Sequence, residues 1–352
     1  MTINDLELSL IEIDRPPSGE PVRSLLVRLS GDSGFEGWGE STTAWRPAEL
    51  SARRDVLMPA LAGRSVFDIE DLLDLEVLSD PALRAAIEMA SWDLAGRVVG
   101  QPVCHLFGGG YRRQVPLAVR LECGASGCPD DLVQLARELA EQGFHCQIVV
   151  SSGQPQCDLE TIRTIRESVG DRAELRYDAM ARFDPETARE LCGELEVHGL
   201  QFVLDPLDTG DLHSIAALRR QTSVPLAIWR DVHDSSDVLA VVRSGAAAFV
   251  VVDPQQVGGM VPARKCAAVA EAAGIGAVLG GGPSLGIATA AMLQLAAAIP
   301  AFASGNECGY RQLQDDVLSE PLESVDGMIT VPTAPGLGIE VDRAKVERYQ
   351  VT

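Results

Sequence analysis

The chain has 352 residues, 46% of them hydrophobic, which is enough to bury one large α/β domain and a smaller one. Its formal net charge of −22 argues against nucleic acid and anionic membranes as partners, because phosphate binding depends on Lys and Arg. No apolar run approaches the roughly 20 residues of a membrane span, and the N-terminus lacks a basic signal-peptide region. We therefore expect a cytoplasmic protein whose partner is a small-molecule substrate or ligand. We also expect a homo-oligomer.

The first part of the chain predicts a small α+β unit. Three antiparallel strands are expected between residues 6 and 40, and helices are expected at 47–61, 66–75 and 81–99. The last of these helices ends at Gly100-Gln101-Pro102, a typical helix stop.

From Val115 onward, short apolar strands alternate with helical stretches, which indicates parallel βα units. Strands are predicted at 115–121, 146–150, 174–178, 200–204, 226–228, 249–252 and 275–279, with an eighth near 301–304. Helices are predicted at 130–142, 159–168, 185–196, 212–220, 235–244, 261–273 and 285–298. Seven or eight units within roughly 215 residues fit a (β/α) barrel, with an open doubly wound sheet as the alternative.

One strand ends in a carboxylate. The run Phe249 to Val252 is apolar without alternation, which is typical of a parallel strand buried on both faces, and Asp253 follows it. Chemistry in such folds lies at the carboxyl ends of strands, so Asp253 stands where a functional group is expected.

Two residue types limit the possible chemistry. The only lysines are Lys265, inside a predicted helix, and Lys345, in the polar tail, so neither is placed as a base. The eight cysteines contain no CxxC motif, which favours reduced thiols over a disulfide framework or a zinc site.

Four segments together resemble the enolase superfamily, specifically its muconate-lactonizing and mandelate-racemase-like members: GWGE at 37–40, AAIEMASWDLAGRVVGQPV at 85–103, VGGM at 257–260 and PGLG at 335–338. The resemblance covers nearly the whole chain. It implies a capping domain, 1–112, completed by the tail 325–352, over a modified seven- to eight-stranded TIM-type barrel, 113–324. It also implies that the loop 15–21 covers the barrel mouth.

The resemblance implies a reaction for which this chain lacks most of the usual catalytic residues. Members of this superfamily abstract a proton next to a carboxylate and hold the resulting enolate on Mg²⁺, with Lys or His bases on either side. Ile148 and Val150 stand in the two lysine positions of the second barrel strand. Asp253 matches an acid that orients a His on the next strand, but that strand, AVLGGGPSLG, contains no His.

The resemblance also implies three acidic metal ligands, and this chain keeps an acid at only one of those positions. Asp178 keeps the first position, Leu204 stands in the second, and Trp229 and Arg230 stand where the third is expected. We therefore expect no metal cofactor. The alternative is a Mg²⁺ site rebuilt from Asp178, Asp205 and Asp231, since Mg²⁺ needs only one or two protein carboxylates plus water.

Four residues are candidates for catalysis. Asp253 can act as a general base or cap the following helix, and Arg230 can bind a substrate carboxylate or pair with Asp178 or Asp231. Glu307 matches a position that in racemase-like members donates a hydrogen bond to the substrate carboxylate. The catalytic candidates are Asp178, Arg230, Asp253 and Glu307, and the substrate-contacting candidates are Trp229, Ser284, His233 and His145.

The glycine-rich loop 280–284 precedes a predicted helix, so its backbone N–H groups can cradle an anion. Cys146 and Cys308 are expected to be inert.

Three functions remain open at this point. The first is a metal-independent isomerase or lyase that isomerises, eliminates or cyclises a small, carboxylate-bearing molecule. The second is a non-catalytic relative that binds a ligand or a protein. The third is a conventional Mg²⁺-dependent racemase, cycloisomerase or dehydratase with a rebuilt metal site.

Overall fold

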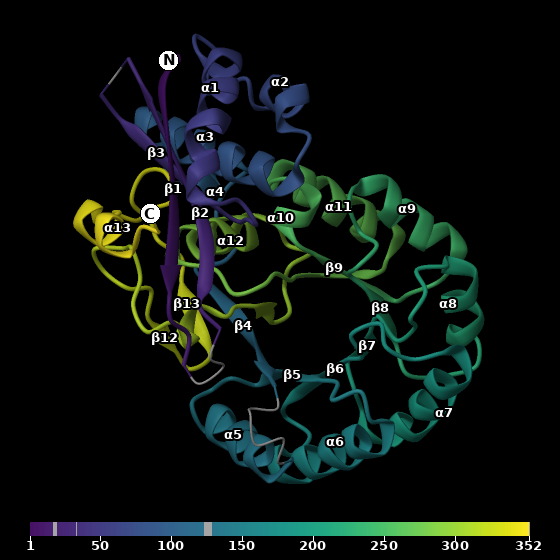
Figure 1. The fold of residues 1–352 in the computed structure, drawn as a ribbon. Helices are drawn as coiled ribbons and strands as arrows, with labels where there is room; N and C mark the ends of the chain where they lie inside the picture. Colours follow the sequence, from purple (N-terminus) through teal and green to yellow (C-terminus); the bar gives the residue numbers. More distant parts are fainter. Residues whose placement is uncertain (17–19, 33, 123–128, 352) are drawn as a thin grey trace.

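The N-terminal part of the chain forms an antiparallel sheet in the order β1 (Ile3–Ile13), β2 (Val22–Gly31) and β3 (Glu36–Thr42). This computed structural model describes residues 1–16, 20–32, 34–122 and 129–351 (Figure 1). Helix α3 (Pro81–Val99) packs directly on β3. A Cβ atom at Gly39 would lie 1.9 Å from the carbonyl oxygen of Ala86, so only glycine permits this close packing.

Short helices complete this unit. They are η1 (Pro47–Glu49), α1 (Leu50–Leu61), α2 (Ile69–Leu73), η2 (Glu76–Leu78) and α4 (Val103–Leu106). Helix α3 begins after Asp80, whose carboxylate accepts a hydrogen bond from the Ala82 N–H, and ends at Gly100 in the left-handed conformation.

Parallel strands then form a barrel whose helices lie outside it (Figure 1). The strands are β4 (Gln114–Leu121), β5 (Cys146–Val150), β6 (Glu174–Asp178), β7 (Phe202–Leu204), β8 (Leu226–Ile228), β9 (Phe249–Val252), β10 (Gly276–Leu279) and β11 (Asn306–Glu307). The helices are α5 (Pro129–Glu141), α6 (Pro155–Val169), α7 (Pro185–Leu195), η3 (Glu196–His198), α8 (Leu212–Arg219), α9 (Ser235–Ser244), α10 (Pro254–Val257), α11 (Met260–Ala273) and α12 (Gly286–Ala298). The predicted fold class, a modified barrel with an α+β cap, is confirmed.

The eighth strand was predicted in the wrong place. Residues 301–304 form an irregular connection in which Phe302 is buried, and β11 follows at Asn306–Glu307, where it pairs with β4. The Asn306 side chain joins β11 to β10, because its carbonyl oxygen accepts the Leu279 N–H at 3.0 Å. A side-chain amide therefore links the two strands where the barrel closes, and apolar periodicity cannot reveal such a contact.

Two small apolar clusters fill the barrel interior and are separate from the main core. One contains Phe202, Leu204, Ala227, Val251 and Val278, with Trp229 packed against it. The other contains Ala118, Cys146 and Ile148. Leu204 and Ile148 therefore occupy interior positions, as strand alternation requires.

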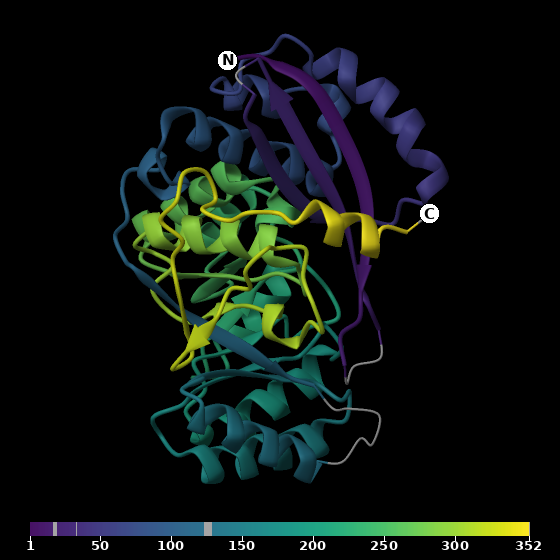
Figure 2. The ribbon, with the colours of Figure 1, turned by 90° about the vertical axis from the view of Figure 1, so that its left-hand side faces the viewer.

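The C-terminal segment contacts both the barrel and the cap. Strands β12 (Ser324–Val325) and β13 (Met328–Thr330) form a hairpin that pairs with the start of β4, so this part of the tail extends the barrel sheet. After η4 (Tyr310–Gln312) and β13, helix α13 (Arg343–Tyr349) lies beside β1 (Figure 2). In the described ranges, no helix is both long and apolar enough to cross a membrane.

Buried carboxylates attach the cap to the barrel. Glu88 on α3 accepts the N–H groups of Met260 and Val261 at 2.5 and 2.8 Å, at the start of α11. Glu40 on β3 accepts the N–H groups of Leu285 and Ala288, at the start of α12. Helix N-termini favour negative charge, yet burial raises the pKa of Glu88 and of Glu40 to about 7.

We predict that Glu88→Gln weakens the pH dependence of stability. Because the pKa of Glu88 rises from 4.5 to about 7 on folding, its contribution to stability is fully present below pH 4.5 and is lost as the pH rises through 7. The loss is on the order of 3 kcal/mol for this one group.

Urea unfolding at pH 5, 6, 7 and 8 measures the effect. The unmodified protein should lose stability over this range more steeply than the Glu88→Gln variant. Glu271→Gln, at an exposed acid of α11, is the matched control and should keep the original slope. Equal slopes in all three proteins would contradict the role assigned to Glu88.

Candidate active site

A buried ion-pair cluster lies at the carboxyl ends of the barrel strands. Arg120 on β4 donates from Nη2 to Asp178 at the end of β6, over 2.7 Å, and from Nη1 to Glu307 on β11, over 3.3 Å. Its Nε also donates to the more exposed Glu122. The side chains of Arg120, Asp178 and Glu307 are only 17, 3 and 6% exposed.

The sequence analysis did not identify Arg120. Its position follows from strand alternation, because Ala118, two residues earlier, faces the barrel interior, and Glu307 pairs in register with Ala118 on the neighbouring strand. The available signal was a single charge in the otherwise apolar strand VPLAVRL, near its carboxyl end.

The electrostatics of the cluster follow from burial and shared charge. Burial raises the pKa of Glu307 to about 7, although the nearby Arg120 guanidinium opposes the rise. The charges of Glu307 and Asp178 raise the pKa of Arg120 against the effect of its own burial. Arg120 therefore stays cationic, while the pKa of Glu307 lies near neutral pH.

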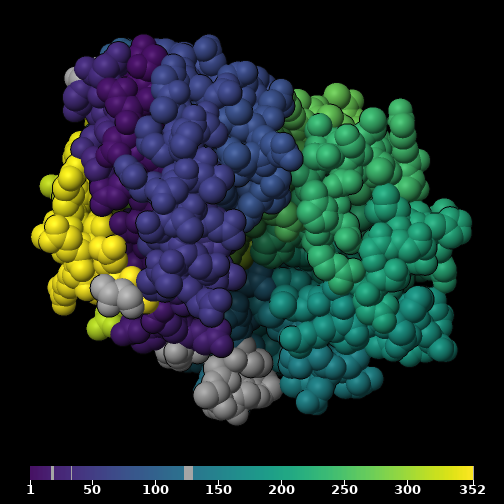
Figure 3. Space-filling model, turned by 45° about the horizontal axis from the view of Figure 1, so that its top comes forward, coloured from purple at the N-terminus to yellow at the C-terminus, as the bar shows by residue number. Residues whose placement is uncertain are grey.

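A cavity of about 240 Å³ opens over this cluster. Its wall includes Arg15 of the cap, Arg120, Met180, Trp229 and Glu307. Figure 3 shows the surface hollowed between the cap, in purple and blue, and the barrel, in teal and green. The mouth cavity thus has walls from both parts of the chain.

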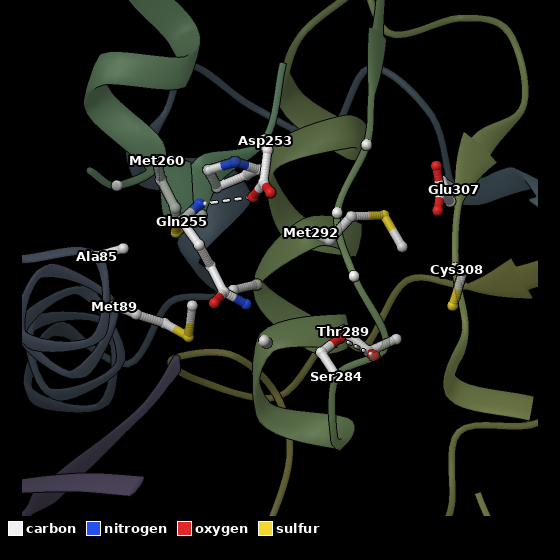
Figure 4. A pocket seen from close by; sticks show the side chains of 17 residues that line it. Ala85, Met89, Asp253, Gln255, Met260, Ser284, Thr289, Met292, Glu307 and Cys308 are labelled. Atoms are coloured by element: carbon white, nitrogen blue, oxygen red, sulfur yellow. Dashed lines mark hydrogen bonds between the residues drawn. The ribbon is translucent and has the colours of Figure 1, made fainter. Parts of the chain in front are cut away.

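A second, smaller cavity of about 40 Å³ lies beside the first and reaches the cap helix α3. Asp253 and Glu307 both line it, from opposite sides in Figure 4. Asp253 accepts the Gln255 N–H at 2.8 Å and so caps α10, while burial raises its pKa to about 6. Asp253 therefore serves as a helix cap and also presents a carboxyl group to a cavity.

Strained backbone marks the same end of the barrel. Met180, Ala181 and Asp205 have φ values of 56, 52 and 42°, in the left-handed region that non-glycine residues rarely adopt. Such residues cluster at functional sites. Here they follow β6 and β7, and the Met180 sulfur accepts a hydrogen bond from Arg120.

Each acid proposed for a rebuilt metal site has another partner. Asp178 pairs with Arg120, and Asp205 accepts the N–H groups of Trp229 and Arg230 at 3.1 and 3.0 Å. The side chain of Asp231 is 39% exposed and lies 3.6 Å from the Arg230 guanidinium. Among the residues that the structure describes, no group of three or more His, Cys, Asp or Glu side chains is arranged to hold a metal ion.

The remaining candidates divide between the cavities and the surface. Trp229 lines the mouth cavity and Ser284 the smaller one. Arg230 is exposed and lines neither of these two cavities, so its placement does not support contact with a substrate there. His233 is exposed beside Asp237, and the exposed His145 precedes β5 and so lies at the opposite, amino end of the barrel.

The helix start behind the glycine-rich loop is already occupied. Glu40 accepts the Leu285 and Ala288 N–H groups, and Asp316 accepts that of Gly286. These protein carboxylates take the donors of α12 that an anion would need. Burial raises the pKa of Cys146 to about 12 and of Cys308 to about 11, which keeps both thiols protonated.

Part of the predicted covering loop 15–21 lies outside the described residues, at 17–19. Arg15 is described. It donates a hydrogen bond to the Gln312 side chain at 3.1 Å and so links the cap to the segment that follows β11.

Two family models match this chain. Residues 20–108 match the mandelate racemase/muconate lactonizing enzyme N-terminal domain, and residues 131–345 match the enolase C-terminal domain-like family. The chain belongs to the mandelate racemase/muconate lactonizing enzyme family. The resemblance to the enolase superfamily is thereby confirmed, and the chain is placed among enzymes of isomerase type.

Individual relatives in this family cover almost the full chain. Muconate cycloisomerase 1 of Rhodococcus opacus is 30% identical over 342 residues, which are 92% of this chain and 90% of that protein. N-succinyl-L-Arg/Lys racemase of Bacillus cereus is 25% identical over 342 residues, 93% of this chain and 90% of that protein. A crystal structure of an enolase from Streptomyces coelicolor superimposes with a TM-score of 0.89 at 28% identity, over 99% of this chain and 96% of that one.

The expectation of no cofactor is wrong on this comparison, because members of the mandelate racemase/muconate lactonizing enzyme family depend on Mg²⁺ or Mn²⁺. The donor set of this chain nevertheless does not fit the three-acid site that the resemblance implies, since Asp178 pairs with Arg120, Leu204 fills the second position, and Trp229 and Arg230 stand at the third. We therefore assign no ligand and no chemical step to the ion.

We predict that Arg120→Gln destabilises the protein more at pH 8 than at pH 5.5. Removing one partner of a buried ion pair costs about 3–5 kcal/mol, because the remaining charge stays buried without compensation. At pH 5.5 Glu307, with a pKa near 7, is protonated and needs less compensation. Urea unfolding at both pH values measures the difference.

Two further variants make the test specific. Adding Asp178→Asn to Arg120→Gln should cost less than the sum of the two single changes, because the two side chains are in contact. Arg230→Gln, at an exposed arginine, should change stability by less than about 0.5 kcal/mol. A pH-independent loss in Arg120→Gln would show that packing, not charge, accounts for it.

Proposed function

We propose that this protein is an isomerase that moves a proton on a small, carboxylate-bearing molecule bound in the barrel mouth. The observation that carries the proposal is a pair of carboxyl groups, Glu307 and Asp253, which line one cavity and have pKa values raised to about 7 and about 6. Proton transfer is most efficient when the pKa of the acid or base lies near the working pH.

The two groups differ in protonation between pH 6 and 7. Asp253 is then mainly ionised and accepts a proton from the substrate. Glu307 is largely protonated and donates a proton to the substrate from the opposite side of the cavity. The exchange leaves the composition of the substrate unchanged, as in a racemisation, a double-bond shift or a ring closure within one molecule. Asp178 orients Arg120, whose fixed charge stabilises negative charge that develops beside Glu307.

The substrate class rests on the mouth cavity and on the relatives. Arg15 lines the cap side of the cavity, and a guanidinium favours a carboxylate through paired hydrogen bonds. The names muconate cycloisomerase and N-succinyl-L-Arg/Lys racemase both describe enzymes that act on carboxylates. We extend that substrate class to this chain, together with a homo-oligomeric assembly that light scattering can measure.

A non-catalytic binding protein is the competing function. The observation in its favour is that aliphatic Ile148 and Val150 stand in the two positions of the usual lysine bases. Such a protein would bind carboxylates at the same mouth without exchanging their protons.

Deuterium exchange separates the two functions. We expect the protein to incorporate deuterium next to the carboxylate of at least one acid from a panel in D₂O, measured by ¹H NMR. Asp253→Asn and Glu307→Gln should each slow this exchange by about 10²-fold or more. Asp231→Asn, outside the cavities, should keep the original rate.

Each assay is run with Mg²⁺, with Mn²⁺ and with a chelator, so that the metal dependence seen across the family is measured directly. Binding of an acid without exchange under all three conditions would overturn the isomerase and favour the binding protein.

The pH profile is a separate prediction. We expect kcat/KM to be bell-shaped with limbs near pH 6 and pH 7, since Asp253 loses its basic form below the first and Glu307 its acidic form above the second. Arg120 lowers the pKa of Glu307, so Arg120→Gln should move the alkaline limb to higher pH. A variant that is merely less stable would lose activity without moving this limb.

A further inference from the structure

Three methionines form the apolar wall of the smaller cavity. Met89 comes from the cap helix α3, Met260 from the first residue of α11, and Met292 from α12. Figure 4 shows Met292 between Asp253 and Glu307, and Met89 and Met260 on the side of the cap. These side chains come from three elements far apart in sequence, and we call the space that they border the methionine chamber.

The methionine chamber and the mouth cavity share part of their walls. Glu307, Cys308, Gly281 and Gly282 line both. Because Glu307 and its neighbours belong to both walls, the chamber adjoins the mouth cavity at Glu307. Gln255 also lines the chamber, and its side-chain oxygen accepts hydrogen bonds from the backbone and the hydroxyl of Thr42 in the cap, at 2.7 and 3.0 Å.

We infer that the methionine chamber binds a short apolar substituent of the substrate and thereby selects which carboxylates enter. This inference rests on the proposed function and names its substrate class: carboxylic acids that carry a short alkyl group beyond the reacting carbon. The carboxylate lies on the side of Arg15 and Arg120, the reacting carbon lies beside Glu307, and the alkyl group lies among the methionines.

The size and the chemistry of the chamber limit the substituent. An apolar cavity of about 150 Å³ accommodates benzene. The chamber, at about 40 Å³, suits a smaller group of a few carbon atoms. Methionine side chains are unbranched and polarizable, so they adapt to alkyl groups of different shape. A ring is disfavoured by the small volume, and a negatively charged group is disfavoured by the carboxyl groups of Asp253 and Glu307 in the wall.

The test uses the full chain with ¹³C-methyl-labelled methionine, of which it has seven. Acetate, butanoate, hexanoate and benzoate are titrated while the methyl signals are followed by NMR. Butanoate should shift the signals of Met89, Met260 and Met292, whereas acetate should not. Met58 and Met328, which line neither of these two cavities, should stay unchanged.

Affinity provides the second readout. Each methylene that enters the chamber should tighten binding about fourfold until the chamber is full, so butanoate should bind roughly 16-fold more tightly than acetate. Met292→Gln should remove this gain and Met292→Leu should keep it. Met328→Gln is the matched control and should behave as the unmodified protein. Equal affinities for acetate and butanoate in the unmodified protein would overturn the inference.

Failure of the inference can be distinguished from failure of the proposed function. If butanoate shifts the signals of the chamber methionines while no acid exchanges its protons, alkyl binding in the methionine chamber is supported and the isomerase function is rejected. A different result is that acids exchange protons but only the methyl signal of Met180, in the mouth cavity, responds. The isomerase function is then supported, and alkyl binding in the methionine chamber is rejected.

Discussion

The barrel mouth depends on one guanidinium shared by two buried carboxylates. Asp178 lies at the end of β6, two strands from β4, and Glu307 lies on β11, which pairs with β4 on the other side. Buried carboxylates of this kind need a positive partner or hydrogen bonds. Arg120 supplies that charge from β4 itself. Burial raises the pKa of Glu307 to about 7, and Arg120 limits this rise, so the same ion pair holds the cluster together and sets the pKa of a carboxyl group at the barrel mouth.

The cap is also attached to the barrel through buried carboxylates. The N-termini of α11 and α12 are natural anion sites, and the protein fills them with its own Glu88 and Glu40. These contacts fix α3 and β3 against the barrel and so define the two cavities that the cap and barrel line together. The N-termini of these two helices therefore serve to position the cap.

Much of the fold was predictable from the sequence, and the site much less so. The strand at 249–252 and the carboxylate that follows it agree with β9 and Asp253, because an uninterrupted apolar run is a strong signal. Leu204 and Ile148 lie inside the barrel, since alternation fixes their side. The eighth strand was misplaced because the Asn306 side chain, which joins β11 to β10, has no periodicity. Arg120 was missed because one charge in an apolar strand gives no hint of partners 58 and 187 residues away, and the expectation of no cofactor failed because lost ligand positions do not reveal the dependence of a whole family.

The most direct measurement of this account is the titration of the two carboxyl groups themselves. With ¹³C-labelled Glu and Asp side chains, NMR should show Glu307 titrating near pH 7 and Asp253 near pH 6, and the Glu307 midpoint should rise in Arg120→Gln. Titration of both groups near pH 4, with no response of Glu307 to the loss of Arg120, would contradict the central claim that a shared guanidinium holds a proton-exchanging acid at the barrel mouth.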